Sequence, residues 1–574
     1  MNFQKPFAAD PVVRRLSFHV SDNLASLCIG VVFILLILNC VFVDRGYFDT
    51  MPQDLFGYLD GVYRAYLGQI PHRDFSTPQG PLQFLFPALF MKLGAAPVAS
   101  VRYYNAAVLL FAIPIVIYLQ RTRFNNLVAI TLGVLIGATL AAKLMLGDNI
   151  FADATIAMFY NRIGYTFLIL ITALSVPPWK NHNNNLATVD GALMGLLAGL
   201  LFYIKITFGL IALALIVLNL FSSRDTKEKL KGLLASAIVF LLIMIAVELV
   251  YGVRFAWLRD MQMATASTKR YWTTPFKKLL LSGPEVVGAI VIPVVALGLG
   301  GVGSRPYWLL LAALLGAASS VLVLYSAQGP ILFLPIAFLL AASALLDRHE
   351  AAFSEPTADS RWRSIGLNAW CVALMAALAY PLLYNIVSSS ALYALEKPLN
   401  KDNPVLASIH TRGPYGNEGT FSISQANQLV PYDLVVAARA SKNPFMFDTA
   451  SFRDFVVYAQ EGIRSAKAGC PANSRIATLD AVNAFPVLLG WPEGGGMLFI
   501  NPLYLTSVKS HLPAEVMYRD IDCILVPKMQ LVWGSREFLE DIYGDYLTRN
   551  FEQSYESRFW KVLKRDTLIV SRPK

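Results

Sequence analysis

The sequence has few charged, metal-ligating or disulfide-forming residues for its length. Of 574 residues, 15% are charged and only five are cysteine. Five cysteines are too few for a disulfide scaffold, and no His or Cys cluster has metal-site spacing. Walker-type and dinucleotide-binding glycine motifs are also missing, which argues against a nucleotide sugar as a direct ligand. The sequence has no internal repeat and no low-complexity tract.

What the chain has in abundance is apolar residues. They make up 56% of it, and the mean hydropathy of +0.51 is far above that of soluble domains, which predicts a membrane protein. The net charge of +10 does not indicate nucleic acid, because the basic residues fall in short clusters between apolar segments. Arg14 and Arg15 precede an apolar stretch that is too long for a signal peptide and lacks a cleavage site, so we expect an uncleaved first span.

A membrane-spanning helix needs about 20 apolar residues, and by this criterion we expect about eleven spans. They are predicted near residues 24–43, 103–119, 125–146, 162–178, 188–204, 207–222, 231–251, 283–300, 306–325, 330–346 and 365–386. The apolar stretch 79–94 is short and contains Pro87, so we predict a helix in the membrane interface.

This count places the basic residues between the spans on one side of the membrane. They are Lys5, Arg14, Arg15, Arg121, Arg123, Lys180, Arg224, Lys227, Lys229, Lys231, Arg305, Arg348, Arg361 and Arg363. By the positive-inside rule that side, with the N-terminus, is cytoplasmic. The loops that hold Asp54, Asp148 and Lys269 then face outward, as does the C-terminus.

From about residue 388 the composition becomes that of a soluble domain, with turn-rich stretches between short apolar runs. We therefore predict a membrane module over 1–387 and an outer α/β domain over 388–574. Residues 451–469 have helical spacing with Ser451 as a cap, and 559–566 with 567–573 are expected to form a β-hairpin.

The cysteines fall into two groups, one in each of these predicted parts of the chain. Cys28, Cys40 and Cys371 lie in apolar spans and are expected to be packing residues. Cys470 and Cys523 lie in the polar region and could pair if it is outside the cytosol.

The first outer loop is rich in acids, which at the mouth of a helical bundle indicate the handling of protons, cations or chemistry. They are Asp44, Asp49, Asp54, Asp60 and Asp74. Asp54 opens a stretch in which Leu55, Leu59 and Val62 recur at helical spacing. The alternative role for Asp54 is to cap this helix, because the helix dipole favours an acid there.

The loop continues with Gly-Gln-Ile-Pro-His-Arg-Asp-Phe over 68–75 and Pro-Gln-Gly-Pro-Leu over 78–82. An acid on an amphipathic helix followed by these elements resembles the first periplasmic loop of the GT-C membrane glycosyltransferases. That class includes protein O-mannosyltransferases and the aminoarabinose and galacturonic acid transferases of lipid A. The resemblance covers the order of elements over roughly residues 20–280. Gln79 and Gly80 stand where many members have His-Pro, which leaves the sugar open.

The resemblance implies a bacterial inner-membrane enzyme whose donor is a polyprenyl-phosphate sugar and whose catalytic base falls on Asp54. The chemistry agrees, because an attacking hydroxyl must lose a proton and the departing phosphate needs cations. The candidate cations are Arg162, Lys205, Lys269 and Arg270. The alternatives are that Lys205 snorkels to the headgroups and that Lys269 and Arg270, with neighbouring aromatics, form an interfacial anchor.

The remaining polar residues are expected to shape the acceptor site or order its loop. They are Arg73, Asp74, Gln79, Asp148 and Asp153. For Asp148 and Asp153 the options are to orient the acceptor, to hold a divalent cation or to pair with Arg162, and one of the two is expected to be a plain loop acid. Asp60 is not expected to pair with Asp54, because six residues place it on another helix face.

The predicted function is inverting transfer of a sugar to a hydroxyl of an envelope glycan, a glycolipid or a protein. One alternative is a flippase or other transporter of lipid-linked sugars, although inverted repeats and charge-rich spans are lacking. The other is an O-antigen polymerase or ligase, which uses a pyrophosphate-linked sugar and is usually marked by arginines in a large late loop. The late loops here are short.

Overall fold

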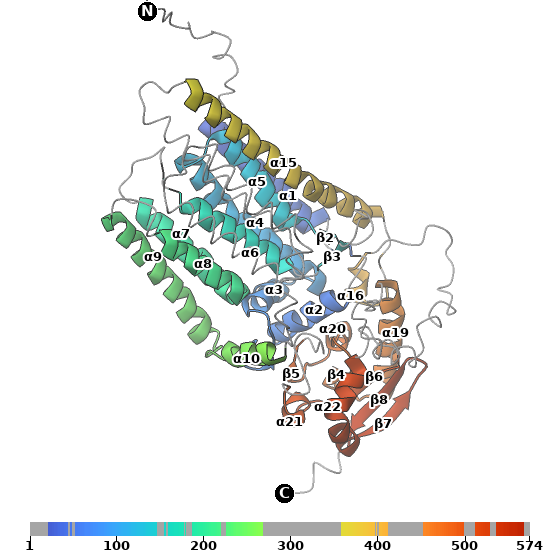
Figure 1. The fold of residues 1–574 in the computed structure, drawn as a ribbon. Coiled ribbons are helices and arrows are strands. Elements are labelled where there is room, and N and C mark those ends of the chain that lie inside the picture. The colour runs from blue at the N-terminus through green and yellow to red at the C-terminus, as the bar shows by residue number, and fades with distance from the viewer. Residues whose placement is uncertain are drawn as a thin grey trace, which may run out of the picture.

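In the computed structural model, apolar helices form an elongated bundle with a smaller, sheet-containing unit at one end (Figure 1). The structure describes residues 21–43, 46–48, 52–145, 154–156, 159–176, 178, 186–219, 226–267, 358–395, 398, 401–410, 452–498, 511–528 and 535–566. The spans expected at 283–300, 306–325 and 330–346 lie outside the described residues.

Every predicted span that falls within the described residues is a helix. The bundle consists of α1 (Asp22–Leu38) with its π-helical extension η2 (Asn39–Val43), α4 (Pro97–Thr122), α5 (Asn126–Ala141), α6 (Phe159–Leu174), α7 (Leu186–Ile204), α8 (Ile206–Asn219), α9 (Thr226–Ile245) with η3 (Ala246–Val250), and α15 (Ala358–Leu395). Within the described ranges, five helices are long and apolar enough to cross a membrane: α1, α4, α7, α9 and α15. Helices α5, α6 and α8 are apolar but shorter.

Helices α7 and α9 run parallel and approach closely along a row of glycines. A Cβ atom at Gly191 or Gly195 of α7 would overlap backbone atoms of Gly232 or Ser236 of α9. Small residues let helix backbones approach in this way where lipid provides no hydrophobic driving force. Both helices begin at the end of the bundle where Arg123 pairs with Asp190. This end is called the opposite end below.

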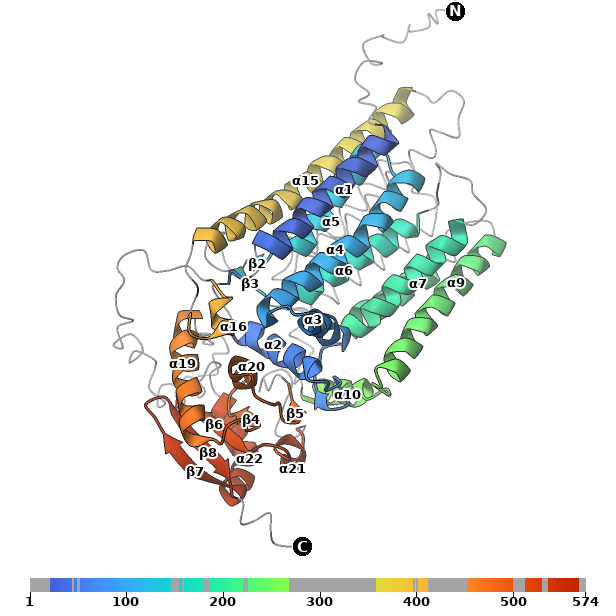
Figure 2. The same ribbon diagram turned by 180° about the vertical axis from the view of Figure 1, so that it is seen from behind.

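Three helices lie at the other end of the bundle, called the site end (Figures 1 and 2). They are α2 (Pro52–Tyr66), α3 (Leu82–Lys92) and α10 (Trp257–Ser267). Helix α2 is the amphipathic helix expected after Asp54, and α3 is the short helix expected within 79–94. All residues of α2 except Asp54 and Tyr66 are buried, because α3 and the C-terminal unit cover it from two sides.

The C-terminal unit, described over 452–498, 511–528 and 535–566, contains a four-stranded sheet. Its elements are α19 (Phe452–Gly469), β4 (Ile476–Thr478), α20 (Phe485–Leu489), β5 (Gly496–Met497), α21 (Ala514–Met517), β6 (Cys523–Pro527), α22 (Ser535–Asn550), β7 (Phe551–Glu556) and β8 (Trp560–Arg565). The sheet order is β4-β6-β8-β7, with β4 and β6 parallel and the other pairs antiparallel.

The predicted helix over 451–469 is confirmed as α19, although Ser451 lies outside the described residues. The predicted pairing of 559–566 with 567–573 is wrong. Strand β8 pairs with β7 on one edge and β6 on the other, which leaves it no free edge. The partner strand precedes β8, and residues 567–573 are outside the described part.

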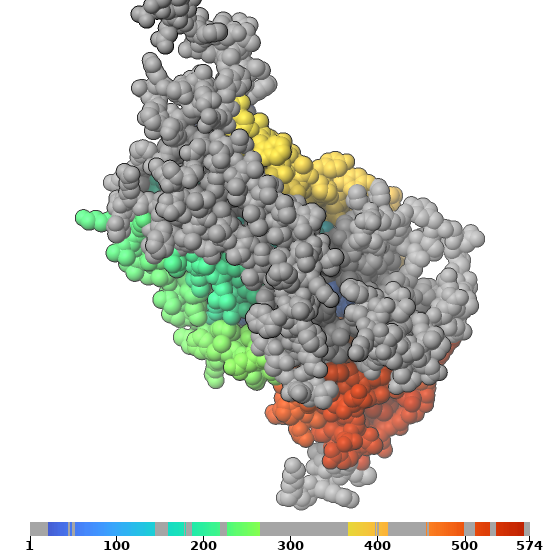
Figure 3. All heavy atoms as spheres, in the orientation of Figure 1, coloured from blue at the N-terminus to red at the C-terminus, as the bar shows by residue number. Residues whose placement is uncertain are grey.

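The C-terminal unit shares a hydrophobic core with the first loop, between α1 and α4. The rings of Phe56 and Phe455 stack with centroids 4.2 Å apart, and β1 (Phe75–Ser76) pairs in parallel with β5. Met263 of α10 packs against a second core cluster of the unit, and the surfaces of α10 and the unit adjoin in Figure 3. Three short elements complete the described structure: β2 (Leu144–Met145), β3 (Ala154–Thr155) and α16 (Pro404–Ala407).

Candidate functional site

Asp54 lies in the first turn of α2 and is half-buried. The helix begins at Pro52, so Asp54 is inside the helix and is not the N-cap. Burial raises the pKa of Asp54 to about 6, because a carboxylate loses hydration there. A general base works best when its pKa lies near the pH of the reaction, so this carboxyl group is suited to accept a proton near neutral pH.

Asp54 faces the beginning of α6. Tyr58, one helical turn further along α2, packs edge-on against Phe159 with ring centroids 4.8 Å apart, and its hydroxyl donates to the backbone oxygen of Gln83 at 2.6 Å. The charge of Asp54 acts on the neighbouring Tyr160. The first turns of α2 and α6 therefore form one polar–aromatic corner.

Lys205 joins this corner from the break between α7 and α8. Its Nζ donates to Oδ1 of Asn161 at 3.0 Å and lies 5.1 Å from the ring centroid of Tyr160 and 5.4 Å from that of Phe208. These contacts turn the ammonium group toward α6. The ring of Tyr160 thus lies next to the Lys205 ammonium group, and Tyr160 is also within range of the negative charge of Asp54.

The Pro-Gln-Gly-Pro-Leu element docks beside the same break. The backbone N–H of Gly80 donates to the oxygen of Ile204 at 3.2 Å, and Nε2 of Gln83 donates to the same oxygen at 2.7 Å. A Cβ atom at Gly80 would overlap the backbone oxygen of Tyr203. Glycine is needed here because the two backbones touch, and the contact fixes the turn next to Lys205.

A second group of cations gathers at the C-terminal end of α5. Arg102 donates to the oxygen of Ala141 at 2.8 Å, and Arg162 donates to the oxygen of Ala142. The two guanidinium charges repel each other. Lys143 is buried above the rings of Phe48 and Tyr47, with its Nζ 4.9 and 5.5 Å from their centroids. Three cationic side chains therefore lie near the C-terminal end of α5, at the site end.

Several buried polar atoms near this corner have no hydrogen-bond partner among the described residues. They are Oε1 of Gln79, the Tyr104 hydroxyl and Nδ2 of Asn161. An unpaired buried polar group costs about 1–3 kcal/mol. Gln79 adjoins the Gly80 contact, Tyr104 lies beside Phe159, and Asn161 binds Lys205. A polar ligand would satisfy these groups.

Arg73 and Asp74 form an exposed pair that orders their own turn. Nη2 of Arg73 lies 2.8 Å from Oδ2 of Asp74, and Asp74 accepts the backbone N–H of Ile70 at 2.7 Å. The expected pairing of Asp74 is therefore found with Arg73, whereas Arg64 pairs elsewhere.

Arg64 is the centre of a buried charge cluster between α2 and the C-terminal unit. Its Nε lies 2.7 Å from Asp60 and its Nη2 lies 3.2 Å from Glu493, and it also donates to the oxygen of Gly494. Burial raises the pKa of Asp60 and, with the adjacent Asp60 charge, raises the pKa of Glu493 well above its usual value. One guanidinium thus faces two buried carboxyl groups, and the pKa of both is raised.

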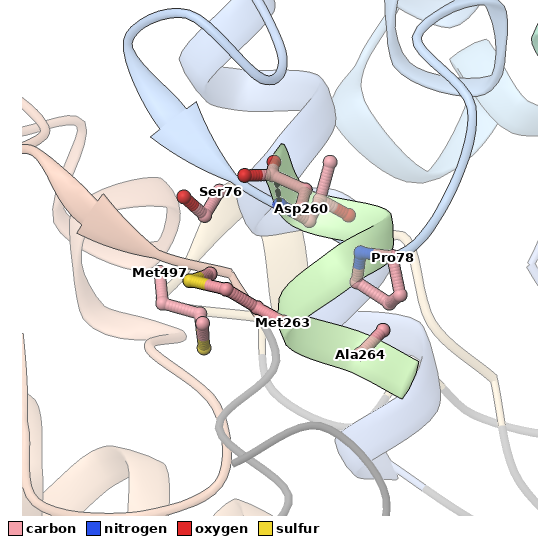
Figure 4. Close-up of a pocket in the computed structure, with 7 residues that line it drawn as sticks. Ser76, Pro78, Asp260, Met263, Ala264 and Met497 are labelled. Atoms are coloured by element: carbon pink, nitrogen blue, oxygen red, sulfur yellow. Dashed lines mark hydrogen bonds between the residues drawn. The ribbon is translucent and has the colours of Figure 1, made fainter. Parts of the chain in front are cut away.

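A buried hydrogen bond between two side chains holds α10 against the first loop. Nδ1 of His72 lies 2.9 Å from Oδ2 of Asp260, and the same oxygen accepts the N–H of Thr77 at 2.9 Å. Asp260 borders a hollow that is also lined by Ser76, Thr77, Pro78, Met263, Ala264 and Met497 (Figure 4). This hollow is small, and it holds none of the predicted catalytic residues.

Asp54, Lys205 and Arg162 lie at the site end, and Gln79 adjoins the Gly80 contact at the α7–α8 break. Asp148, Asp153, Lys269 and Arg270 lie outside the described residues. Within the described ranges, no group of three His, Cys, Asp or Glu side chains is arranged to hold a metal ion.

Sequence reasoning missed several residues of the site end. Lys143 follows the apolar run of α5, which is the same signal that identified Lys205, and Asn161 adjoins Arg162. Arg102 and Glu493 carry no comparable local signal. A comparison of the chain with models of known protein families, with curated proteins and with solved structures finds no match.

Proposed function

We propose that the chain is a membrane glycosyltransferase that moves a sugar from a polyprenyl-phosphate donor to a hydroxyl acceptor, with inversion, in the manner of the GT-C class it resembles. Asp54 is the base that takes the acceptor proton. Lys205 and Arg162 bind the phosphate that leaves. The acceptor is a glycan, a glycolipid or a protein of the cell envelope.

The observation that carries the proposal is the corner between α2, α6 and the α7–α8 break. It combines a carboxyl group of raised pKa with a lysine and unpaired polar atoms. A base and a cation at one site are what transfer from a lipid phosphate requires. The unpaired Oε1 of Gln79 can accept a hydrogen bond from a sugar hydroxyl, and the unpaired Nδ2 of Asn161 can donate to a sugar or phosphate oxygen.

The proposed architecture is about eleven spans in the bacterial inner membrane, with the site end and an α/β domain over 388–574 in the periplasm. The distribution of charge supports this orientation. Arg121, Arg123 and Lys227 lie at the opposite end of the bundle, where the positive-inside rule expects the cytoplasm.

The decisive experiment measures envelope glycans and lipid A by mass spectrometry in a deletion strain that carries wild-type or variant genes. Asp54→Asn should abolish the sugar adduct that the wild type restores, because the amide cannot accept a proton, while the amount of protein in the membrane stays unchanged. Asp520→Asn, an exposed acid of the C-terminal unit, is the matched control and should behave as wild type. Full restoration by Asp54→Asn would exclude Asp54 as the base.

The donor class is tested by binding to purified protein. Undecaprenyl phosphate should bind more weakly to Lys205→Ala by about 10-fold or more, as expected for a lost charge-assisted hydrogen bond. Lys92→Ala, at the exposed end of α3, should bind as wild type. Equal affinity of Lys205→Ala and wild type would contradict the phosphate role. Tighter binding of undecaprenyl pyrophosphate would favour the polymerase or ligase alternative.

A further inference from the structure

The fold brings together Cys470 and Cys523, the cysteines of the C-terminal unit. Cys470 follows directly after α19, and Cys523 is the first residue of β6. Helix α19 lies against β8, where a Cβ atom at Gly469 would be 2.9 Å from Cβ of Val562, and β8 is the neighbour of β6 in the sheet. This packing places both side chains in one buried core cluster of the unit, where each thiol influences the ionisation of the other.

Both side chains are enclosed by the unit. Cys470 is 8% exposed and Cys523 is fully buried. The other cysteines of the chain, Cys28, Cys40 and Cys371, lie in helices of the bundle. A disulfide between Cys470 and Cys523 would therefore join two adjacent elements and be shielded from solvent thiols.

We propose that Cys470 and Cys523 form a structural disulfide in the mature protein, made when the C-terminal unit reaches an oxidising compartment. The oxidant is a disulfide of a thiol–disulfide exchange protein. The two cysteine thiols and one oxidant disulfide give one new S–S bond and two oxidant thiols, which take up both protons and both electrons. Such bonds persist outside the cytosol, so the proposal also places the unit there.

The surroundings favour the second step of the exchange. The neighbouring Cys470 thiol and Ser474 lower the pKa of the Cys523 thiol. A thiolate is the attacking species in thiol–disulfide exchange. Once Cys470 carries the mixed disulfide with the oxidant, Cys523 is the adjacent sulfur that displaces the oxidant.

The oxidation state can be read directly from the full-length protein. Cells are quenched with acid, the protein is denatured and alkylated with N-ethylmaleimide, and trypsin is added without a reductant. Trypsin releases Cys470 in the peptide Ala468–Arg475 and Cys523 in Asp520–Lys528, each with a single cysteine. We expect one species in which these peptides are linked and which separates on reduction. Two alkylated peptides in the unreduced sample would overturn the proposal.

Two variants control for mispairing. In Cys523→Ser the peptide Ala468–Arg475 should carry one N-ethylmaleimide group, and failure to alkylate it would show that Cys470 has another partner and would overturn the pairing. Cys371→Ser, in a bundle helix, should leave the linked species unchanged. None of these measurements depends on sugar transfer, so they fail or succeed independently of the proposed enzymatic function.

Discussion

At the scale of single residues, burial sets the pKa of the carboxyl group that is proposed as the base. Asp54 is exposed enough to meet a substrate and buried enough for its pKa to rise to about 6. The cause of this rise is burial, which removes water from the carboxylate. The carboxyl group is therefore a stronger base than an ordinary aspartate, while most of it remains ionised at pH 7.

This pKa predicts how the proposed activity depends on pH. The base must be deprotonated, so the rate of sugar transfer should be level above about pH 7 and should fall about tenfold per unit below pH 6. The rate is measured with isolated membranes between pH 4.5 and 8. Asp520→Asn should keep the same acidic limb. An acidic limb near pH 4, the ordinary range for aspartate, would contradict the role of burial at Asp54.

At the scale of elements, α2 is held between the bundle and the C-terminal unit. On the bundle side Tyr58 binds the backbone of α3. On the other side Arg64 binds Asp60, Glu493 and the backbone of Gly494. Because Asp54 is in the first turn of this helix, the charge cluster helps to fix the position of the proposed base.

The raised pKa of Glu493 in this cluster predicts a pH-dependent stability. The pKa of Glu493 is higher in the folded protein than its unfolded value of 4.5, so its contribution is fully present below that value and is lost as pH rises through the folded pKa. Each proton released on unfolding changes the free energy of unfolding by about 1.4 kcal/mol per pH unit. Glu493→Gln has no proton to lose and should reduce the fall in thermal midpoint between pH 5 and 8.

The matched control is Glu515→Gln, an exposed glutamate of α21, which should keep the pH dependence of the wild type. Thermal unfolding of detergent-purified protein at several pH values gives both midpoints. An unaltered pH dependence in Glu493→Gln would show that Glu493 is ionised in the folded protein.

The sequence predicted the elements that depend on local patterns. The spacing of Leu55, Leu59 and Val62 predicted α2, and the apolar run broken by Lys205 predicted a cation at a helix break. The cluster of Arg64 with Glu493 was not predictable, because its members are more than 400 residues apart. Strand β8 was located correctly but assigned the wrong partner, since periodicity identifies strands and does not specify their pairing.

At the scale of the whole molecule, the first loop, α10 and the C-terminal unit converge on one end of the bundle (Figures 1 and 2). The core that joins Phe56 to Phe455 and the pairing of β1 with β5 connect segments from both halves of the chain. The C-terminal unit is therefore part of the structure that surrounds the candidate site, and it must lie on the same side of the membrane as Asp54.

This arrangement predicts which positions of the protein a reagent outside intact cells can reach. A membrane-impermeant maleimide should label Asp545→Cys in α22, which is exposed at the site end, because that end is proposed to face the periplasm. Lys227→Cys, exposed at the opposite end in the first turn of α9, should be labelled only after the membrane is permeabilised. The wild type gives the background from native cysteines, which are mostly buried. The reverse pattern would invert the topology and move Asp54 to the cytoplasm, where it could not act on a periplasmic acceptor.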